Sequence, residues 1–182
     1  MLNSLFKSLF TSMRLSNVAW LGLSLVAIVL DQWTKSIATA NLNYGEAKAV
    51  FAGLDWTLLH NTGAAFSFLS DAGGWQRYLF TGMAMLVSVI FVVWLLRLPK
   101  DAKILAAGIA LVLGGAVGNL IDRVSLGHVV DFISVYYKHH YFPAFNIADS
   151  AITVGTILLI IDMLFLDKMR QSNIQSNQAS EE

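Results

Sequence analysis

The sequence predicts an all-α membrane protein with four transmembrane helices. Hydrophobic residues make up 56% of the 182-residue chain and charged residues only 13%, whereas soluble domains carry about 25% charged residues. Four segments are apolar and long enough to span a bilayer, which takes about 20 residues as helix because lipid offers the backbone no hydrogen-bond partner. We expect a single domain over residues 1–182, with helices at about 15–37, 77–97, 104–123 and 146–167 and a disordered polar tail at about 172–182.

The first apolar segment could instead be a cleaved signal peptide. Lys7 and Arg14 precede it, and the small residues at 38–40 resemble a cleavage site. However, Asp31 and Lys35 lie between the apolar run and that site, and the run is long for a signal peptide. We therefore expect a first helix that is retained.

The distribution of Lys and Arg predicts that both termini lie in the cytoplasm. Seven basic residues lie at the ends and in the connection between helices two and three, against five on the opposite side. The short connection at 97–103 is strongly basic, which the positive-inside rule assigns to the cytoplasm. An outer aromatic belt would then contain Trp56, Trp75, Tyr136, Tyr137 and Tyr141.

The two outer connections are long. Residues 54–58 alternate between apolar and polar, which predicts a short strand, and Asn61-Thr62-Gly63 predicts a turn. With Phe66 and Phe68 dipping into the interface, this connection would form a small β platform on the outer leaflet. We expect a loop carrying Asp131 between helices three and four.

Polar residues gather at the outer ends of three predicted helices. Each of these helices carries two polar residues three or four positions apart, which places them on one face. A charge near a helix centre costs about 2.5–3.5 kcal/mol on insertion scales, so such groups usually face a cavity and serve a function. The pairs are Asp31 with Lys35, Asn119 with Asp122, and Asn146 with Asp149, and Asn61, Arg123 and Asp131 lie at the same level.

Structural roles could account for part of this pattern. Asn146 and Asp149 could form a capping box at the start of helix four. Asp31 with Lys35, and Asp122 with Arg123, could form interfacial ion pairs. Neither role accounts for Asp131, Asn119 or Asn61, whereas a shared site accounts for all of them. The glycines at 114, 115 and 118 predict close helix packing.

The available chemistry is that of paired carboxylates. The chain has no cysteine and no serine–histidine–acid pattern, and its outer histidines match no common zinc spacing. Two aspartates about 3 Å apart cannot both ionise, so one keeps a proton while the other activates water against a carbonyl. The positive end of helix four favours charge on Asp149.

Two other classes of protein remain open from the residues alone. A proton-coupled transporter would need polar groups through the full depth of the membrane, and Asp162 is the only candidate in the inner half. A noncatalytic assembly factor would use the glycines to pack partners.

Five segments hold most of these polar residues: 31–35 (DQWTK), 60–67 (HNTGAAFS), 114–123 (GGAVGNLIDR), 129–132 (VVDF) and 145–150 (FNIADS). In order and spacing they resemble the five conserved boxes of the lipoprotein signal peptidases, also called signal peptidase II, over about residues 17–166.

The resemblance implies an aspartic endopeptidase of the bacterial inner membrane with its active site near the periplasmic face. It would remove the signal peptide from diacylglyceryl-modified prolipoproteins by cleaving before the lipidated cysteine. Our own hypothesis is that the platform at residues 56–68 covers the site from the outer side. The resemblance implies membrane lipids and globomycin-type inhibitors as ligands and no cofactor or metal. We expect a monomer that binds no nucleic acid. The resemblance maps the catalytic pair onto Asp131 and Asp149, and structural support onto Asp31 and Lys35. It maps substrate binding onto Asn61, Gly63, Asn119, Asp122, Arg123 and Asn146.

Overall fold

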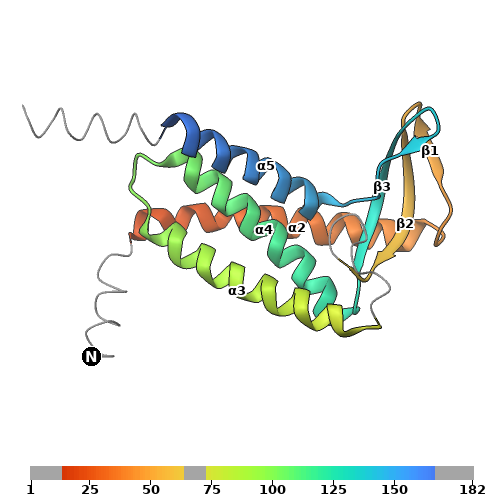
Figure 1. Cartoon of the computed structure of the whole chain (residues 1–182), viewed down its shortest axis with the longest axis horizontal. Helices are drawn as coiled ribbons and strands as arrows, with labels where there is room; N and C mark the ends of the chain where they lie inside the picture. The colour runs from red at the N-terminus through yellow and green to blue at the C-terminus, as the bar shows by residue number, and fades with distance from the viewer. Residues whose placement is uncertain (1–13, 64–72, 167–182) are drawn as a thin grey trace, which may run out of the picture.

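The computed structural model describes residues 14–63 and 73–166. Within them lie four helices long and apolar enough to cross a membrane, with a four-stranded sheet at one end of the bundle (Figure 1). The predictions for Phe66, Phe68 and the tail at 172–182 lie outside the described residues. The helices are α2 (Val18–Asn41), preceded by the 3₁₀ turn Leu15–Asn17, α3 (Trp75–Arg97), α4 (Lys103–Ser125) and α5 (Ile147–Ile161), which continues as a π-helix over Asp162–Leu166.

The four predicted spanning helices are therefore confirmed. Their bounds agree with the expected ones within a few residues, and the largest difference is the end of α2, which continues to Asn41. The apolar run ends near residue 37 because the last turn of this helix carries polar side chains. Thr39 Oγ1 and Asn41 Nδ2 donate to backbone carbonyls one turn earlier, which satisfies their polar atoms.

Helix α4 lies at the centre of the bundle and packs against the other three helices. Its glycines permit this. A Cβ atom on Gly114 would lie 2.7 Å from Ala27 Cβ of α2, and one on Gly118 would lie 2.7 Å from Asp31 Oδ2. Gly115 lies directly against the backbone of Ala148 in α5. The predicted close packing is confirmed, because side chains at these positions would separate the helices that carry the polar residues.

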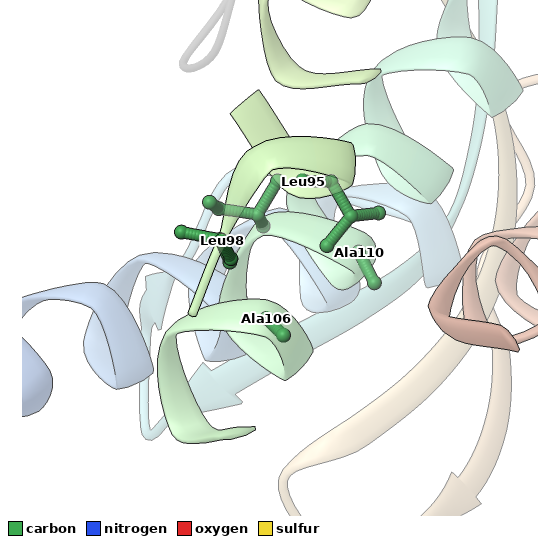
Figure 2. Close-up of a cluster of buried hydrophobic side chains, with 5 residues drawn as sticks. Leu95, Leu98, Ala106 and Ala110 are labelled. Atoms are coloured by element: carbon green, nitrogen blue, oxygen red, sulfur yellow. The ribbon is translucent and has the colours of Figure 1, made fainter. Parts of the chain in front are cut away.

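A small apolar core holds the end of the bundle opposite the sheet (Figure 2). Asn17 closes this end by donating through Nδ2 to the carbonyl oxygens of Leu95 at 3.1 Å and Leu98 at 2.9 Å, where α3 ends. The α3–α4 connection is thereby tied to the start of α2. The core residues are Leu95, Leu98, Ala106, Ile109 and Ala110.

The sheet is antiparallel in the order β1-β2-β3-β4, and its strands run across the ends of the helices (Figure 1). The first outer connection supplies β1 (Lys48–Phe51) and β2 (Leu54–Asn61). The second supplies β3 (Val129–Tyr137) and β4 (His140–Tyr141). The predicted strand at 54–58 is confirmed as the first part of β2.

The prediction that Asp131 lies in a loop is wrong, because Asp131 lies on β3, where it pairs with Leu59 of β2. Residues 129–132 are all buried, so the strand has no alternation of apolar and polar residues for a sequence pattern to detect.

Candidate active site

Asp131 is held by two amide side chains from different elements. Its Oδ1 accepts a hydrogen bond from Asn146 Nδ2 at 2.7 Å, and its Oδ2 accepts one from Asn61 Nδ2 at 3.0 Å. Asn61 is the last residue of β2, where it pairs with Val129 of β3. The β2–β3 pairing therefore sets the distance between this amide and the carboxylate.

Asn146 connects Asp131 to Asp149. It is the N-cap of α5, and its Oδ1 accepts from Asp149 N at 2.9 Å while Asn146 N donates to Asp149 Oδ2 at 3.2 Å. This is the predicted capping box, so that structural explanation is correct. The same side chain uses Nδ2 to bind Asp131. Capping and alignment of the two carboxylates thus share one residue.

The start of α5 is fixed against β3 by backbone hydrogen bonds. Phe145 O accepts from Phe132 N at 3.1 Å and from Ile133 N at 2.9 Å, and Phe145 N donates to Ile133 O at 3.0 Å. Asn146 follows directly, so the strand carrying Asp131 and the helix carrying Asp149 are joined next to both carboxylates.

Asn119 holds the second carboxylate from α4. Its Nδ2 donates to Asp149 Oδ1 at 2.8 Å, and its Oδ1 accepts from Lys35 Nζ at 2.9 Å. Because Lys35 can only donate, it fixes the orientation of the Asn119 amide. The amide nitrogen therefore points at Asp149.

Asp131 is a buried carboxyl close to a second one. Burial and the neighbouring charge of Asp149 raise the pKa of Asp131 to about 7, despite the opposing hydrogen bonds from Asn61 and Asn146. Near neutral pH this carboxyl therefore exists partly with its proton. A pair in which one member keeps a proton can supply both a general acid and a general base.

Lys35 forms the centre of the support beneath the two carboxylates. Its Nζ lies 2.8 Å from Asp31 Oδ2 and 2.8 Å from Asp122 Oδ2. Asp31 Oδ1 accepts from Ala148 N at 2.8 Å, and Asp122 Oδ2 accepts from Val130 N at 3.1 Å. One charge cluster thus binds the residue before Asp149 and the residue before Asp131.

The predicted ion pair between Asp31 and Lys35 is confirmed, whereas the one between Asp122 and Arg123 is wrong within the described residues. Successive residues on a helix point about 100° apart, and here Asp122 faces Lys35. Arg123 Nη2 instead donates to Gly63 O at 3.0 Å. It thereby ties the residue two positions after the end of β2 to the end of α4.

Two polar residues join this cluster without having been assigned a role from the sequence. Gln32 Nε2 donates to Asp122 Oδ1 at 2.8 Å and to Gly118 O at 3.1 Å. Arg77 Nε donates to Arg123 O at 3.0 Å, which fastens α3 to the end of α4. Gln32 could have been found from the sequence, because it is an amide beside Asp31 in an apolar helix. Arg77 could not, because a single charge at a helix end is common.

A cavity of about 700 Å³ opens beside the carboxylates. It lies among α3, α4, α5 and the segment 142–145, and Asp149, Asn119, Arg123 and Asn61 line it on the polar side. Apolar side chains of α3 and α5, including Met83, Val87 and Ile152, form the remaining walls. The cavity therefore has a polar end at the level of the sheet and apolar walls along the helices.

The structure thus brings together every residue that the sequence assigned to the site. Lys35 and Asn146 bind Asn119, which lines the cavity, and Asp131 is bonded to the lining residue Asn61. Asp31 and Asp122 reach the cavity through Lys35. Gly63 O accepts from Arg123. Asp162 does not take part. It is buried in the π-helix at the other end of α5. Within residues 14–63 and 73–166, no three His, Asp or Glu residues are arranged to hold a metal ion.

Four spanning helices and two linked aspartates beside a cavity, Asp131 buried and Asp149 half-buried, define a membrane-embedded hydrolase of the aspartic type. Residues 23–165 match the protein family described as Signal peptidase (SPase) II. The chain belongs to this family, the lipoprotein signal peptidases, as the five motifs predicted.

Similar proteins agree with this membership. The chain is 68% identical over 154 residues to the lipoprotein signal peptidase of Acinetobacter baylyi, covering 85% of this chain and 86% of that one. It is 55% identical over 152 residues to the lipoprotein signal peptidase of Pseudomonas fluorescens, covering 82% and 89%. A solved structure described as a bacterial membrane enzyme superposes with a TM-score of 0.71 at 34% identity, covering 80% of this chain and 87% of that one.

Proposed function

We propose that this signal peptidase II removes the signal peptide from diacylglyceryl-modified bacterial prolipoproteins, cleaving before the lipidated cysteine, with Asp131 and Asp149 as its catalytic pair. The observation that carries this assignment is the position of Asn146. Its side chain donates to Asp131 Oδ1 through Nδ2 and its backbone N donates to Asp149 Oδ2, so one residue contacts both carboxylates. Helix capping accounts for the contacts with Asp149 but not for the one with Asp131.

Asp149 acts as the general base and Asp131 as the general acid. Asp149 lies in the first turn of α5, where the helix dipole stabilises negative charge, whereas the pKa of Asp131 is raised to about 7. Asp149 takes a proton from water as the oxygen bonds to the scissile carbonyl carbon, and Asp131 gives its proton to the carbonyl oxygen. Asp149 then gives the proton it took from water to the leaving nitrogen as the carbon–nitrogen bond breaks, and Asp131 takes back a proton from a hydroxyl of the tetrahedral intermediate.

The lining of the cavity suits a signal peptide as substrate. Its apolar walls on α3 and α5 suit a signal peptide in helical form, and its polar end provides donors for the extended backbone around the scissile bond. Asn61, Asn119, Asp122, Arg123 and Asn146, with the backbone of Gly63, are the substrate-binding residues of this proposal. Arg123 is placed to hold a carbonyl while it secures the outer connection.

The protein is a single domain over residues 1–182 and lies in the bacterial inner membrane. Both termini are cytoplasmic, so the sheet and the site lie at the periplasmic face. The basic connection at 97–103 supports this orientation. We further propose that the chain acts as a monomer, contacts membrane lipids directly and is inhibited by globomycin-type compounds that occupy the cavity.

The proposal is tested with membranes that contain the native chain, Asp131→Asn or Asp149→Asn, supplied with a diacylglyceryl-modified prolipoprotein. Each variant should leave the precursor uncut on a gel, and globomycin should block the native chain. Asp101→Asn, an equivalent change in the exposed α3–α4 connection, should cleave normally. Near-native cleavage by either site variant, at equal expression, would refute the catalytic pair and make Asp122 the next candidate.

A further inference from the structure

A second groove, of about 300 Å³, lies between the outer end of α2 and the sheet. It shares no lining residue with the cavity beside Asp149. The lining comprises Thr34, Ile37, Ala38, Asn41 and Leu42 on or just after α2, together with Lys48, Trp56 and Phe132 on β1, β2 and β3. Along α2 the groove extends from residue 34 to residue 42, which corresponds to about 12 Å of helix rise.

Apart from Lys48, the lining of the groove presents hydrocarbon, although it includes the polar residues Thr34 and Asn41. Thr34 Oγ1 donates to Leu30 O at 2.7 Å and to Asp31 O at 3.0 Å, and Asn41 Nδ2 donates to Ile37 O at 2.8 Å. Both side chains are thus bonded to the backbone of their own helix. A peptide lying there would find few partners for its polar backbone, and leaving such groups unpaired is costly. An acyl chain has no polar groups and needs no hydrogen-bond partners.

One positive charge marks the sheet side of the groove. Lys48 is exposed at the start of β1, and no carboxylate lies within ion-pair distance of it in the described part of the chain. Trp56 pairs with Lys48 across the strands, and its ring stacks at an angle on Phe132 with centroids 5.9 Å apart. An apolar slot beside a tryptophan and a lysine, at the end of a spanning helix, matches the boundary between acyl chains and headgroups.

We propose that this groove binds a phospholipid of the outer leaflet, with one acyl chain along α2 and its phosphate at Lys48. The occupant is an anionic lipid of the bilayer rather than the substrate, because the groove has no lining residue in common with the cavity. Phe132 is the neighbour of Asp131, and successive residues of a strand point to opposite faces. The lipid therefore packs on the sheet directly behind the catalytic strand.

The absence of cysteine from the chain allows the groove to be blocked after folding. Ile37→Cys, purified folded in mild detergent and then modified with an alkyl methanethiosulfonate, places a hydrocarbon chain in the groove. Ser36→Cys is the matched control, since Ser36 is exposed on the same helix and does not line the groove. Native mass spectrometry then counts retained phospholipids, which requires no enzyme activity.

The unmodified protein should retain one phospholipid in the presence of phosphatidylglycerol. Modification at residue 37 should lower retention at least tenfold, while modification at residue 36 should leave it unchanged. Lys48→Gln should reduce the preference for phosphatidylglycerol over phosphatidylethanolamine about fivefold, the effect of one lysine near an anionic headgroup. Lys138→Gln removes an exposed charge from the turn between β3 and β4, which does not line the groove, and should not change this preference.

Two results would overturn the proposal. Equal retention after modification at 36 and at 37 would place the lipid elsewhere on the protein. Displacement of the retained phospholipid by a diacylglyceryl lipopeptide, one for one and blocked by modification at 37, would make the groove a subsite for the substrate. Lipid retention can also be measured on Asp149→Asn, because the measurement requires no enzyme activity. Failure of this proposal can therefore be told apart from failure of the catalytic assignment.

Discussion

Replacing Lys35 with methionine should destabilise the protein more than any other single loss of charge in the described residues. The side chain is 4% exposed, and its Nζ contacts Asp31 and Asp122, each at 2.8 Å, and Asn119 Oδ1 at 2.9 Å. Methionine preserves much of the volume but leaves two buried carboxylates without their cation. The variant therefore tests the charge of Lys35 rather than its packing.

The expected loss follows from the remaining partners. Removing one member of a buried ion pair costs about 3–5 kcal/mol. Asp31 keeps the hydrogen bond from Ala148 N, and Asp122 keeps the one from Val130 N, so a value near the lower end, about 3 kcal/mol, is expected. For a protein of this size that corresponds to a Tm about 6–12 °C lower.

Thermal unfolding in one detergent, followed by the loss of soluble monomer, measures this directly. Lys100→Met, an exposed residue of the α3–α4 connection, should change Tm by no more than about 2 °C. Because Lys35 also orients Asn119 towards Asp149, the variant should cleave slowly even at temperatures where it remains folded. A Tm within about 2 °C of the native value, with cleavage unchanged, would refute the role assigned to the cluster.

Three further perturbations have outcomes set by the same contacts. Since the pKa of Asp131 is raised from 3.8 to about 7, the folded protein binds a proton in this range that the unfolded chain releases. The unfolding free energy should therefore fall as pH rises from 3.8 to about 7, and Asp131→Asn should flatten the profile of Tm against pH. Asn146→Ala removes the N-cap of α5, which should lower the free energy of unfolding in denaturant by about 0.5–2 kcal/mol. It should also lower kcat at least tenfold because it removes a hydrogen bond to Asp131. A kcat within twofold of native would contradict the alignment role. Gly115→Ala should lower Tm because its methyl group meets the backbone of Ala148, at a cost of about 1–3 kcal/mol, whereas Gly82→Ala, with nothing within 4 Å of the new methyl group, should leave Tm equal or higher.

The helices could be predicted from the sequence because membrane insertion depends on length and hydrophobicity, which are local properties. The pairs at 31 and 35, 119 and 122, and 146 and 149 were also predictable, because helical spacing places each pair on one face. Their convergence followed from the helix directions. For these residues the periodicity of a single helix was sufficient.

The partner of each polar group could not be predicted in the same way. The sequence suggested Arg123 for Asp122, but the tertiary packing of α2 against α4 provides Lys35 instead. Strand β3 was missed because all of residues 129–132 are buried and show no alternation. The roles of Gln32 and Arg77 depend on contacts with residues 90 and 46 positions away, which only the folded chain defines.

The arrangement explains how two carboxylates on different elements are held close together. Asp131 lies on a strand and Asp149 on a helix, and a small relative shift of these elements would separate the two groups. Asn146 prevents this, because breaking its contact with Asp131 would also disturb the cap on which α5 depends. Asp31 binds the backbone of residue 148 and Asp122 that of residue 130, so one lysine holds both elements from beneath. The stability of the bundle and the geometry of the pair therefore depend on the same contacts, and variants of Lys35 and Asn146 should lose both properties together.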